Sequence, residues 1–203
     1  SLHDALPISY DAQNLVLSGG VFYNVKLNLQ LLKSVEGSVC VYPLAGDQGC
    51  AIGLYVRDHP EFVFPADLSW GHRRLFDPGE VRGMVFTDDP RRAMDIVTDK
   101  LRTVGRVNVV RGPMEFGPRA LCNTSTLALP TREQVDAINL ANNRNTVMPM
   151  APVMTLSRYI STFEDHAKRV WRSHKHMVIA LEHQEYPDES IAGVTHKYLA
   201  PYV

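Results

Sequence analysis

Cysteine is scarce in this 203-residue sequence, and its three cysteines (Cys40, Cys50 and Cys122) are scattered along the chain. So few scattered thiols exclude a disulfide framework and a structural zinc site. All three have apolar or small neighbours, which predicts reduced, buried thiols and a cytoplasmic protein. Long apolar runs are also missing. Since a membrane-spanning helix needs about 20 apolar residues, we expect no membrane segment.

An excess of charge of either sign is absent as well. The chain has 21 Lys and Arg against 22 Asp and Glu, for a net charge of −1. A general nucleic-acid-binding protein requires a basic face, so that class is not expected. Hydrophobic residues make up 45% of the chain and charged residues 21%. This is the balance of a globular protein that is long enough to bury a core.

The two ends of the sequence suggest that it is part of a longer protein. Residues 1–8, SLHDALPI, read as the translation of a common sequencing-adapter oligonucleotide, so we treat them as an artefact and exclude them from the fold. The last residues, THKYLAPYV, contain no closing cap or charged tail. We therefore expect a fragment that is truncated at both ends.

The first part of the chain has an α/β pattern. Asn14–Ser18 and Ser38–Tyr42 are short apolar segments typical of strands. Between them, apolar residues recur at helical spacing from Phe22 to Lys33, and a second helix is expected from Ala51. The order strand, helix, strand, helix indicates an α/β layer. Residues 61–89, with little periodicity, are predicted to be a connection.

The second part has the same character. Asp89 and Pro90 predict the N-cap and first position of a helix. Arg106–Val110 alternates as a strand does. The pair Thr131 and Gln134 forms a capping-box pattern at the start of another helix, which we expect to stop at Asn142-Asn143. Further expectations are a strand over Met177–Leu181 and a solvated basic helix end within residues 166–183.

The segment RGPMEFGPRALCNTSTLALP, residues 111–130, is rich in turns. Its glycines and prolines hold backbone N–H groups in fixed directions. Arg119 adds a planar fork that matches the oxygens of phosphate or carboxylate. The segment therefore predicts an anion site.

Two shorter motifs lie in the first part. Gly19-Gly20, between a strand and a helix, allow close approach of the backbone to a ligand, although a purely structural turn explains them equally well. Asp47 lies in the loop PLAGDQG, where an aspartate most often bonds its own backbone.

The string MEFGPRALCNTS resembles the MEFGPRALGNRS signature of the O-carbamoyltransferases, the nodulation and antibiotic carbamoyl-transfer enzymes. SGGVFYNVKLN resembles their GGV-x-x-N element. The resemblance implies the C-terminal part of an actin-like (ribonuclease H-like), Kae1-type domain over residues 9–60. A YrdC-like α/β domain is implied over residues 90–203.

The family resemblance also implies a reaction. The second domain would form carbamoyl adenylate from carbamoyl phosphate and ATP with Mg. The first domain would then transfer the carbamoyl group to a hydroxyl of a small-molecule or nucleoside-type acceptor. A divalent metal, expected to be iron, would belong to the complete first domain. Its HxxxH ligands are absent from this sequence.

The family motifs assign residues to these steps. Arg119 and Glu115 would be catalytic, and Asp47 would be a metal ligand. Adenylate would contact Gly19, Gly20 and Asn24. The groups that bind carbamoyl phosphate and ATP would be Arg111, Arg119, Asn123, Ser125 and Arg144.

Several positions depart from the family pattern. Pro113, Thr124 and Met148 stand where arginines are expected, and Cys122 replaces a glycine. His196 aligns with a family T-H position, but the H-x-D-G-T string that usually follows is absent. Because the expected arginines are missing, an alternative function stays open: a catalytically impaired module that binds a nucleotide or phosphate. A threonylcarbamoyl transferase related to tRNA modification is a second alternative, although such enzymes do not usually carry MEFGPRAL.

Overall fold

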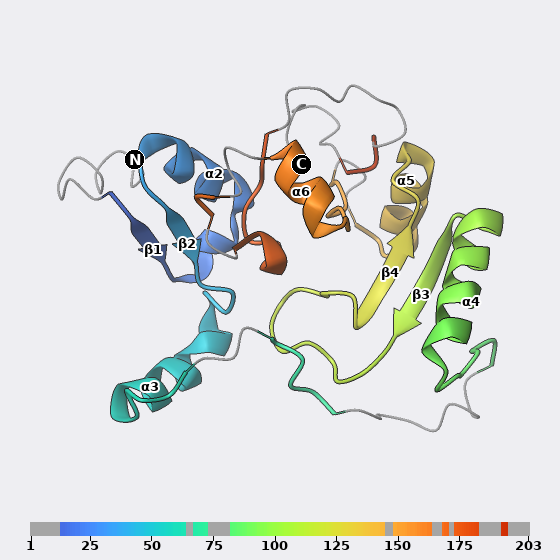
Figure 1. Ribbon diagram of the computed structural model, residues 1–203, viewed down its shortest axis with the longest axis horizontal. Helices are drawn as coiled ribbons and strands as arrows, with labels where there is room; N and C mark the ends of the chain where they lie inside the picture. The colour runs from blue at the N-terminus through green and yellow to red at the C-terminus, as the bar shows by residue number, and fades with distance from the viewer. Residues whose placement is uncertain are drawn as a thin grey trace.

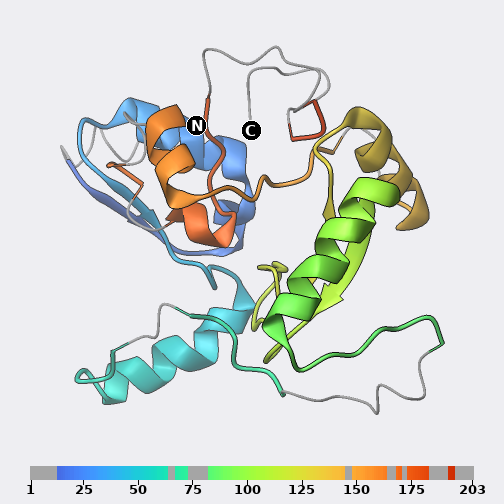
Figure 2. The same ribbon diagram turned by 45° about the vertical axis from the view of Figure 1, so that its right-hand side comes forward.

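The computed structural model describes residues 13–63, 67–72, 82–144, 148–163, 168–170, 173–182 and 192–194. Two groups of elements lie side by side in both views (Figures 1 and 2). One group contains β1, β2, α2 and α6, and the other contains β3, β4, α4 and α5. The artefact proposed for residues 1–8 and the alignment of His196 lie outside the described residues.

The first group is built on a strand–helix–strand unit. β1 (Leu15–Leu17) and β2 (Val39–Val41) pair in parallel, and the crossover contains η1 (Gly20–Tyr23) and α2 (Val25–Ser34). The predicted strands and helix are therefore confirmed, with shorter strands. Leu29 and Leu32 of α2 are fully buried against the sheet. Because the strands are parallel, their carboxyl ends meet at one edge, where η2 (Asp47–Gly49) and α3 (Cys50–Asp58) follow β2.

The second group is an antiparallel pair with helices beside it. β3 (Arg106–Val110) pairs with β4 (Thr124–Ala128), and residues 111–123, here called the signature loop, connect them. α4 (Pro90–Thr103) precedes β3, and α5 (Arg132–Ala141) follows β4. The Asp89 side chain accepts a hydrogen bond of 2.9 Å from the Arg91 N–H, which confirms the predicted cap.

Only half of the predicted capping box forms at α5. Thr131 Oγ1 accepts the Gln134 N–H at 3.4 Å, as a cap should. The Gln134 side chain, however, accepts a hydrogen bond from Arg106 Nη1 at 3.0 Å. It pairs with the neighbouring strand because β3 brings a guanidinium within reach. The helix ends at Asn142 and Asn143, as predicted, with Asn143 at φ 52°.

The strand predicted over Met177–Leu181 is wrong. This segment follows η4 (Ser173–His176) and forms no strand, although Val178–Leu181 is buried. Its backbone groups pair with the helical region: the Val178 carbonyl accepts from Asn28 Nδ2 at 2.6 Å, and the Ala180 N–H donates to Val25. The apolar composition of residues 177–181 suggested a strand. Their backbone instead pairs with groups of α2, so no strand forms.

The core of the first group draws on both parts of the chain. Tyr159 of α6 (Leu156–Thr162), with Phe163, Val170 and residues 178–181, joins the buried side chains of β1, α2 and β2. Of the predicted basic helix end, Lys168 and Lys175 are exposed as expected, whereas Val170 and Ser173 are buried. The chain is mixed α/β, as predicted. The assignment to an actin-like and a YrdC-like domain stays a prediction.

Two further sequence expectations concern side chains and helices. The prediction of buried thiols is wrong for Cys50, which is exposed, while Cys40 and Cys122 are half-buried and all three are free. Within the described part of the chain, none of the helices has the length and apolar character required to cross a membrane.

Candidate functional site

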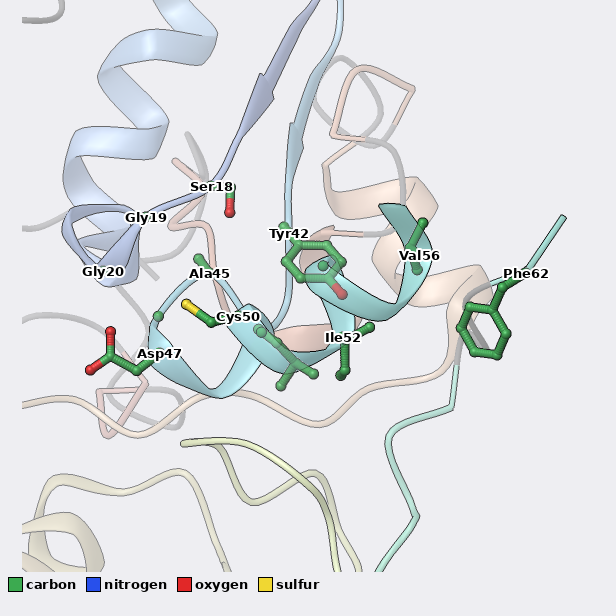
Figure 3. Close-up of a pocket in the computed structure, with 14 residues that line it drawn as sticks. Ser18, Gly19, Gly20, Tyr42, Ala45, Asp47, Cys50, Ile52, Val56 and Phe62 are labelled. Atoms are coloured by element: carbon green, nitrogen blue, oxygen red, sulfur yellow. The ribbon is translucent and has the colours of Figure 1, made fainter. Parts of the chain in front are cut away.

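A pocket of about 650 Å³ lies at the carboxyl edge of the β1–β2 sheet (Figure 3). Ligands of open α/β sheets bind at this edge, because the loops that follow the strands converge there. The wall is formed by the glycine turn (residues 18–20) after β1, the aspartate loop (residues 42–49) after β2, the start of α3, and Phe62. Asp47 and Cys50 lie towards the glycine turn, whereas Val56 and Phe62 lie at the other end.

The glycine turn has the conformation that its sequence requires. Gly19 has φ 119°, a value that side chains rarely tolerate, and its N–H donates to the Ala45 carbonyl at 2.8 Å. This hydrogen bond joins the glycine turn to the aspartate loop. Beside Gly20 the space is open, since a Cβ added there would meet no atom within 4 Å. The two predicted glycines therefore line the pocket with backbone rather than side chains.

Asn24, unlike Gly19 and Gly20, does not lie at the pocket. It is exposed, and its side chain caps α2 by accepting the Leu27 N–H at 3.2 Å. It is not among the residues that line the pocket. The structure therefore gives Asn24 a helix-capping role.

Asp47 lines the pocket with an exposed side chain at the start of η2. A divalent metal requires several converging donors. Among the described residues, no group of three or more His, Cys, Asp or Glu side chains could hold a metal ion. The donors present do not fit a complete metal site, so no step of the chemistry is derived through one.

Glu115 organises the signature loop from inside. The side chain is 8% exposed. Its Oε1 accepts the N–H groups of Leu121 and Asn123, each at 2.6 Å, and Oε2 accepts the Thr124 hydroxyl at 2.5 Å. Burial raises the pKa of Glu115, but the hydrogen bonds from Thr124, Asn123 and Leu121 together lower the pKa below its usual value. Both oxygens are engaged by the loop and the first residue of β4, so the structure supports a positioning role.

Asn123 connects the signature loop to a segment that the sequence did not single out. Its Nδ2 donates to Ser69 Oγ at 2.7 Å and to the Pro113 carbonyl at 2.8 Å. Residues 67–71, the docking segment, also form two backbone hydrogen bonds with the loop: Gly71 to Met114 at 2.8 Å and Phe116 to Leu68 at 2.7 Å.

The docking segment belongs to the predicted connection, residues 61–89. Trp70 stacks on Phe116 with 5.5 Å between ring centroids. At Gly71 a Cβ would lie 2.8 Å from the Met114 side chain, so glycine permits this approach. The Asp67-x-Ser69 turn, in which Asp67 Oδ1 accepts the Ser69 N–H at 2.8 Å, was a local signal that could have marked an ordered segment.

Arg119 joins the signature loop to η1, the short helix that starts at the glycine turn. Its Nη2 donates to the Tyr23 carbonyl at 3.3 Å, and Cζ lies 6.0 Å from the centroid of the Tyr23 ring. Among the described residues, Nε is buried without a hydrogen-bond partner. The signature loop also contacts Leu44. The backbone of Gly117 lies so near this residue that a Cβ at Gly117 would approach Leu44 Cδ2 to 2.7 Å. Leu44 lines the pocket.

The remaining predicted residues are only partly brought together. Arg111 Nε donates to Asn123 Oδ1 at 3.3 Å, and Ser125 Oγ accepts the Cys122 N–H at 3.0 Å. Arg144 lies after α5, where its Nη1 contacts Met150 Sδ at 3.7 Å. Arg111 and Arg119 thus belong to the signature loop, and Ser125 of β4 contacts it through Cys122. Arg144 contacts Met150 instead.

Comparisons with known proteins agree with both motif sets. The family model described as carbamoyltransferase N-terminus matches residues 1–56, and that described as carbamoyltransferase C-terminus matches residues 98–200. The two matches fall on the two regions that contain the glycine turn and the signature loop.

Individual relatives include proteins with assigned names. Nodulation protein NolO of Bradyrhizobium diazoefficiens is 35% identical over 153 residues, which cover 68% of this chain and 28% of the relative. The 3'-hydroxymethylcephem-O-carbamoyltransferase of Amycolatopsis lactamdurans is 31% identical over 167 residues, covering 74% of this chain and 31% of the relative. An uncharacterized protein of Methanocaldococcus jannaschii is 30% identical over 166 residues, covering 74% and 31%.

The chain thus spans about three tenths of the length of these relatives. The C-terminal family model alone accounts for half of its residues, and the N-terminal model matches a separate region before it. On these matches, the chain belongs to the carbamoyltransferase family.

Proposed function

We propose that the protein containing this chain is an ATP-dependent O-carbamoyltransferase. The observation that carries the proposal is the contact between the two family motifs. Arg119 of the signature loop bonds the Tyr23 carbonyl, next to the pocket that Gly19 and Gly20 line. If carbamoyl adenylate forms at the signature loop and is used at the pocket, the two motifs must lie close together.

The proposed chemistry has three steps. Carbamoyl phosphate and water give carbamate and phosphate. Carbamate then attacks the α-phosphorus of ATP with Mg, forming carbamoyl adenylate and releasing pyrophosphate. Finally, a hydroxyl of the acceptor attacks the carbamoyl carbon, and AMP leaves as the hydroxyl proton passes to a base. Activation is necessary because carbamate is a poor electrophile until it has a good leaving group.

The described residues supply binding and orientation for this chemistry. The guanidinium of Arg119 would meet a phosphoryl oxygen through N–H donors that the Tyr23 carbonyl does not engage. Glu115 would act by holding the backbone of the signature loop in the shape that presents Arg119. The open backbone at Gly20 would allow the adenylate to approach the pocket wall closely. The divalent metal and the acceptor would be held mainly by residues outside this chain.

The acceptor class is a hydroxyl-bearing small molecule or nucleoside. The relative from Amycolatopsis lactamdurans is named for a hydroxymethyl cephem acceptor, which supports a hydroxyl nucleophile in general. The carbamoyltransferase matches also favour carbamoyl transfer over the threonylcarbamoyl alternative. A cytoplasmic location is proposed from the three free cysteines.

The test is carbamoyl-phosphate-dependent release of pyrophosphate from ATP, measured on the complete reading frame. Loss of one preorganised donor at a developing charge costs roughly 10²–10³ in rate, so we expect Arg119→Ala to lower release by about that factor. Arg57→Ala, in an exposed pair with Asp58 on α3, is the matched control. Turnover that is equal in Arg119→Ala and the control would remove Arg119 from the site.

A second candidate function is a nucleotide- or phosphate-binding module without turnover. It is favoured by Pro113, Thr124 and Met148 at the expected arginine positions, and by the contact of Arg144 with Met150. Binding of ATP with no pyrophosphate release would support it. Met148→Arg should then raise release if loss of charge is the cause, and an unchanged rate would exclude that cause.

A further inference from the structure

Tyr23 occupies an unassigned position in the sequence motif. In GGV-x-x-N the two open positions are Phe22 and Tyr23, so the motif itself gives Tyr23 no role. Tyr23 is the last residue of η1, between the glycine turn and the cap of α2. Its contacts reach two separate loops, the aspartate loop and the signature loop.

The hydroxyl of Tyr23 is held by the aspartate loop. It accepts the Gly46 N–H at 3.1 Å and donates to Gln48 Oε1 at 3.1 Å. The ring also lies against Gly46, where a Cβ would come within 2.8 Å of Tyr23 Cε2. The position of the ring is therefore coupled to that of the loop containing Asp47.

The opposite side of Tyr23 faces the signature loop. Its carbonyl accepts from Arg119 Nη2 at 3.3 Å, and the guanidinium carbon lies 6.0 Å from the ring centroid. That separation is at the outer range of a cation–π interaction. Since one of five N–H donors of Arg119 is used here and Nε has no described partner, the contact orients the guanidinium without occupying it.

We propose that Tyr23 is a positioning residue that fixes Arg119 relative to the pocket at the glycine turn. A ligand that displaces the glycine turn or the aspartate loop would move the Tyr23 ring and with it Arg119. This inference rests on the proposed function in one respect, namely that the adenosine part of the adenylate binds at the pocket.

The experiment follows the Arg119 Nε–H signal by arginine-selective ¹⁵N NMR of the 203-residue chain, with the signal assigned through Arg119→Lys. Tyr23→Phe removes the hydroxyl contacts and keeps the ring, whereas Tyr23→Leu removes both. Tyr55→Phe, an exposed tyrosine on α3, is the control. Adenosine is the pocket probe because it has no phosphate that could bind Arg119 directly. Pyrophosphate is the anionic probe.

Without ligand, the Arg119 signal is expected to move in Tyr23→Leu and not in Tyr55→Phe. With adenosine, it is expected to shift in the wild type and the control but not in Tyr23→Phe. Pyrophosphate affinity should fall roughly twofold to fivefold in Tyr23→Leu, the equivalent of one cation–π contact. Similar unfolding midpoints of Tyr23→Phe and the wild type would show that the lost shift is not loss of fold.

An Arg119 signal that is identical in Tyr23→Leu and the wild type would overturn the proposal, whatever the ligand. An adenosine shift preserved in Tyr23→Phe would overturn the transmission through the hydroxyl. Failure of the wild type to bind adenosine would count against the proposed function at the pocket. The ligand-free comparison would still decide the role of Tyr23 in that case.

Discussion

Cys122 has a backbone conformation that suits glycine. Its φ is 74°, and the related signature has glycine at this position. A side chain in this left-handed region costs about 1–2 kcal/mol. The N–H of Cys122 donates to Ser125 Oγ, so the loop holds the residue in this strained state. The departure from the family pattern therefore has a local energetic cost.

Replacing Cys122 by glycine should stabilise the chain. The relief of strain exceeds the added entropy of glycine in the unfolded state, so we expect Cys122→Gly to raise the free energy of unfolding by about 0.5–1 kcal/mol. Urea unfolding followed by circular dichroism measures this change. Cys122→Ala retains the strain and is the control. An equal gain from alanine would show that the thiol, and not the backbone, was responsible.

Glu115 and Asn24 show that a sequence motif can identify a residue without identifying its task. Both occupy motif positions, yet Glu115 bonds the backbone of its own loop and Asn24 caps α2. A carboxylate or amide suits either a ligand or a backbone N–H, because both partners require the same acceptor oxygen. Only the position of the neighbouring N–H groups distinguishes the two uses.

At the scale of the element, α2 is completed by a residue from the distant C-terminal part of the chain. Arg169 donates through Nε to the Gly37 carbonyl at 3.0 Å and through Nη2 to the Leu32 carbonyl at 2.7 Å, with a further contact to Val35. Helix carbonyls at the C-terminus have no partner within the helix, and a cation interacts favourably with them. The end of α2 thus depends on a segment far away in the sequence.

Removal of this guanidinium should destabilise the first group of elements. Arg169→Met keeps much of the side-chain length but leaves half-buried carbonyls unpaired, so we expect a loss of about 2–3 kcal/mol in the free energy of unfolding. Arg57→Met, which breaks only an exposed pair with Asp58, should cost much less. Chemical denaturation of both variants makes the comparison. Equal losses would contradict the role of Arg169 at α2.

At the scale of the whole molecule, the buried C-terminal segment introduces a dependence on pH. His174 stacks on Tyr159 with 4.3 Å between ring centroids, and its Nδ1 is buried without a partner among the described residues. Burial first, and then the charges of Lys175 and His176, lower the pKa of His174 below its ordinary value of 6.5. The folded state therefore favours neutral His174.

The consequence for stability has a definite sign. Below the ordinary histidine pKa the unfolded chain binds a proton that folded His174 resists, so stability falls as pH falls through that value towards the lower folded pKa. We expect His174→Phe, which keeps the ring stack, to reduce this decline. The measurement is urea unfolding between about pH 8 and pH 5, which brackets the ordinary histidine pKa. His59→Phe, a partly exposed histidine stacked on Tyr55, should keep the decline. A decline of the same size in His174→Phe would contradict the assignment.

Local sequence signals determined the local structure of this protein. Asp89-Pro90, Thr131 and the spacing of Leu29 and Leu32 each act within a few residues, and each feature formed as predicted. The glycine turn also has the backbone that its two glycines indicated. These outcomes follow because caps, turns and amphipathic spacing depend on neighbours along the chain.

Tertiary structure alone decided which distant segments meet. Nothing local indicates that Arg169 ends α2, that residues 67–71 dock on the signature loop, or that Tyr23 bonds Arg119. The segment at residues 177–181, buried from Val178 on, resembled a strand because burial gives the same composition in a strand and in a segment packed on a helix. The pairing of such backbone groups depends on packing between separate parts of the chain, and residue spacing does not encode that packing.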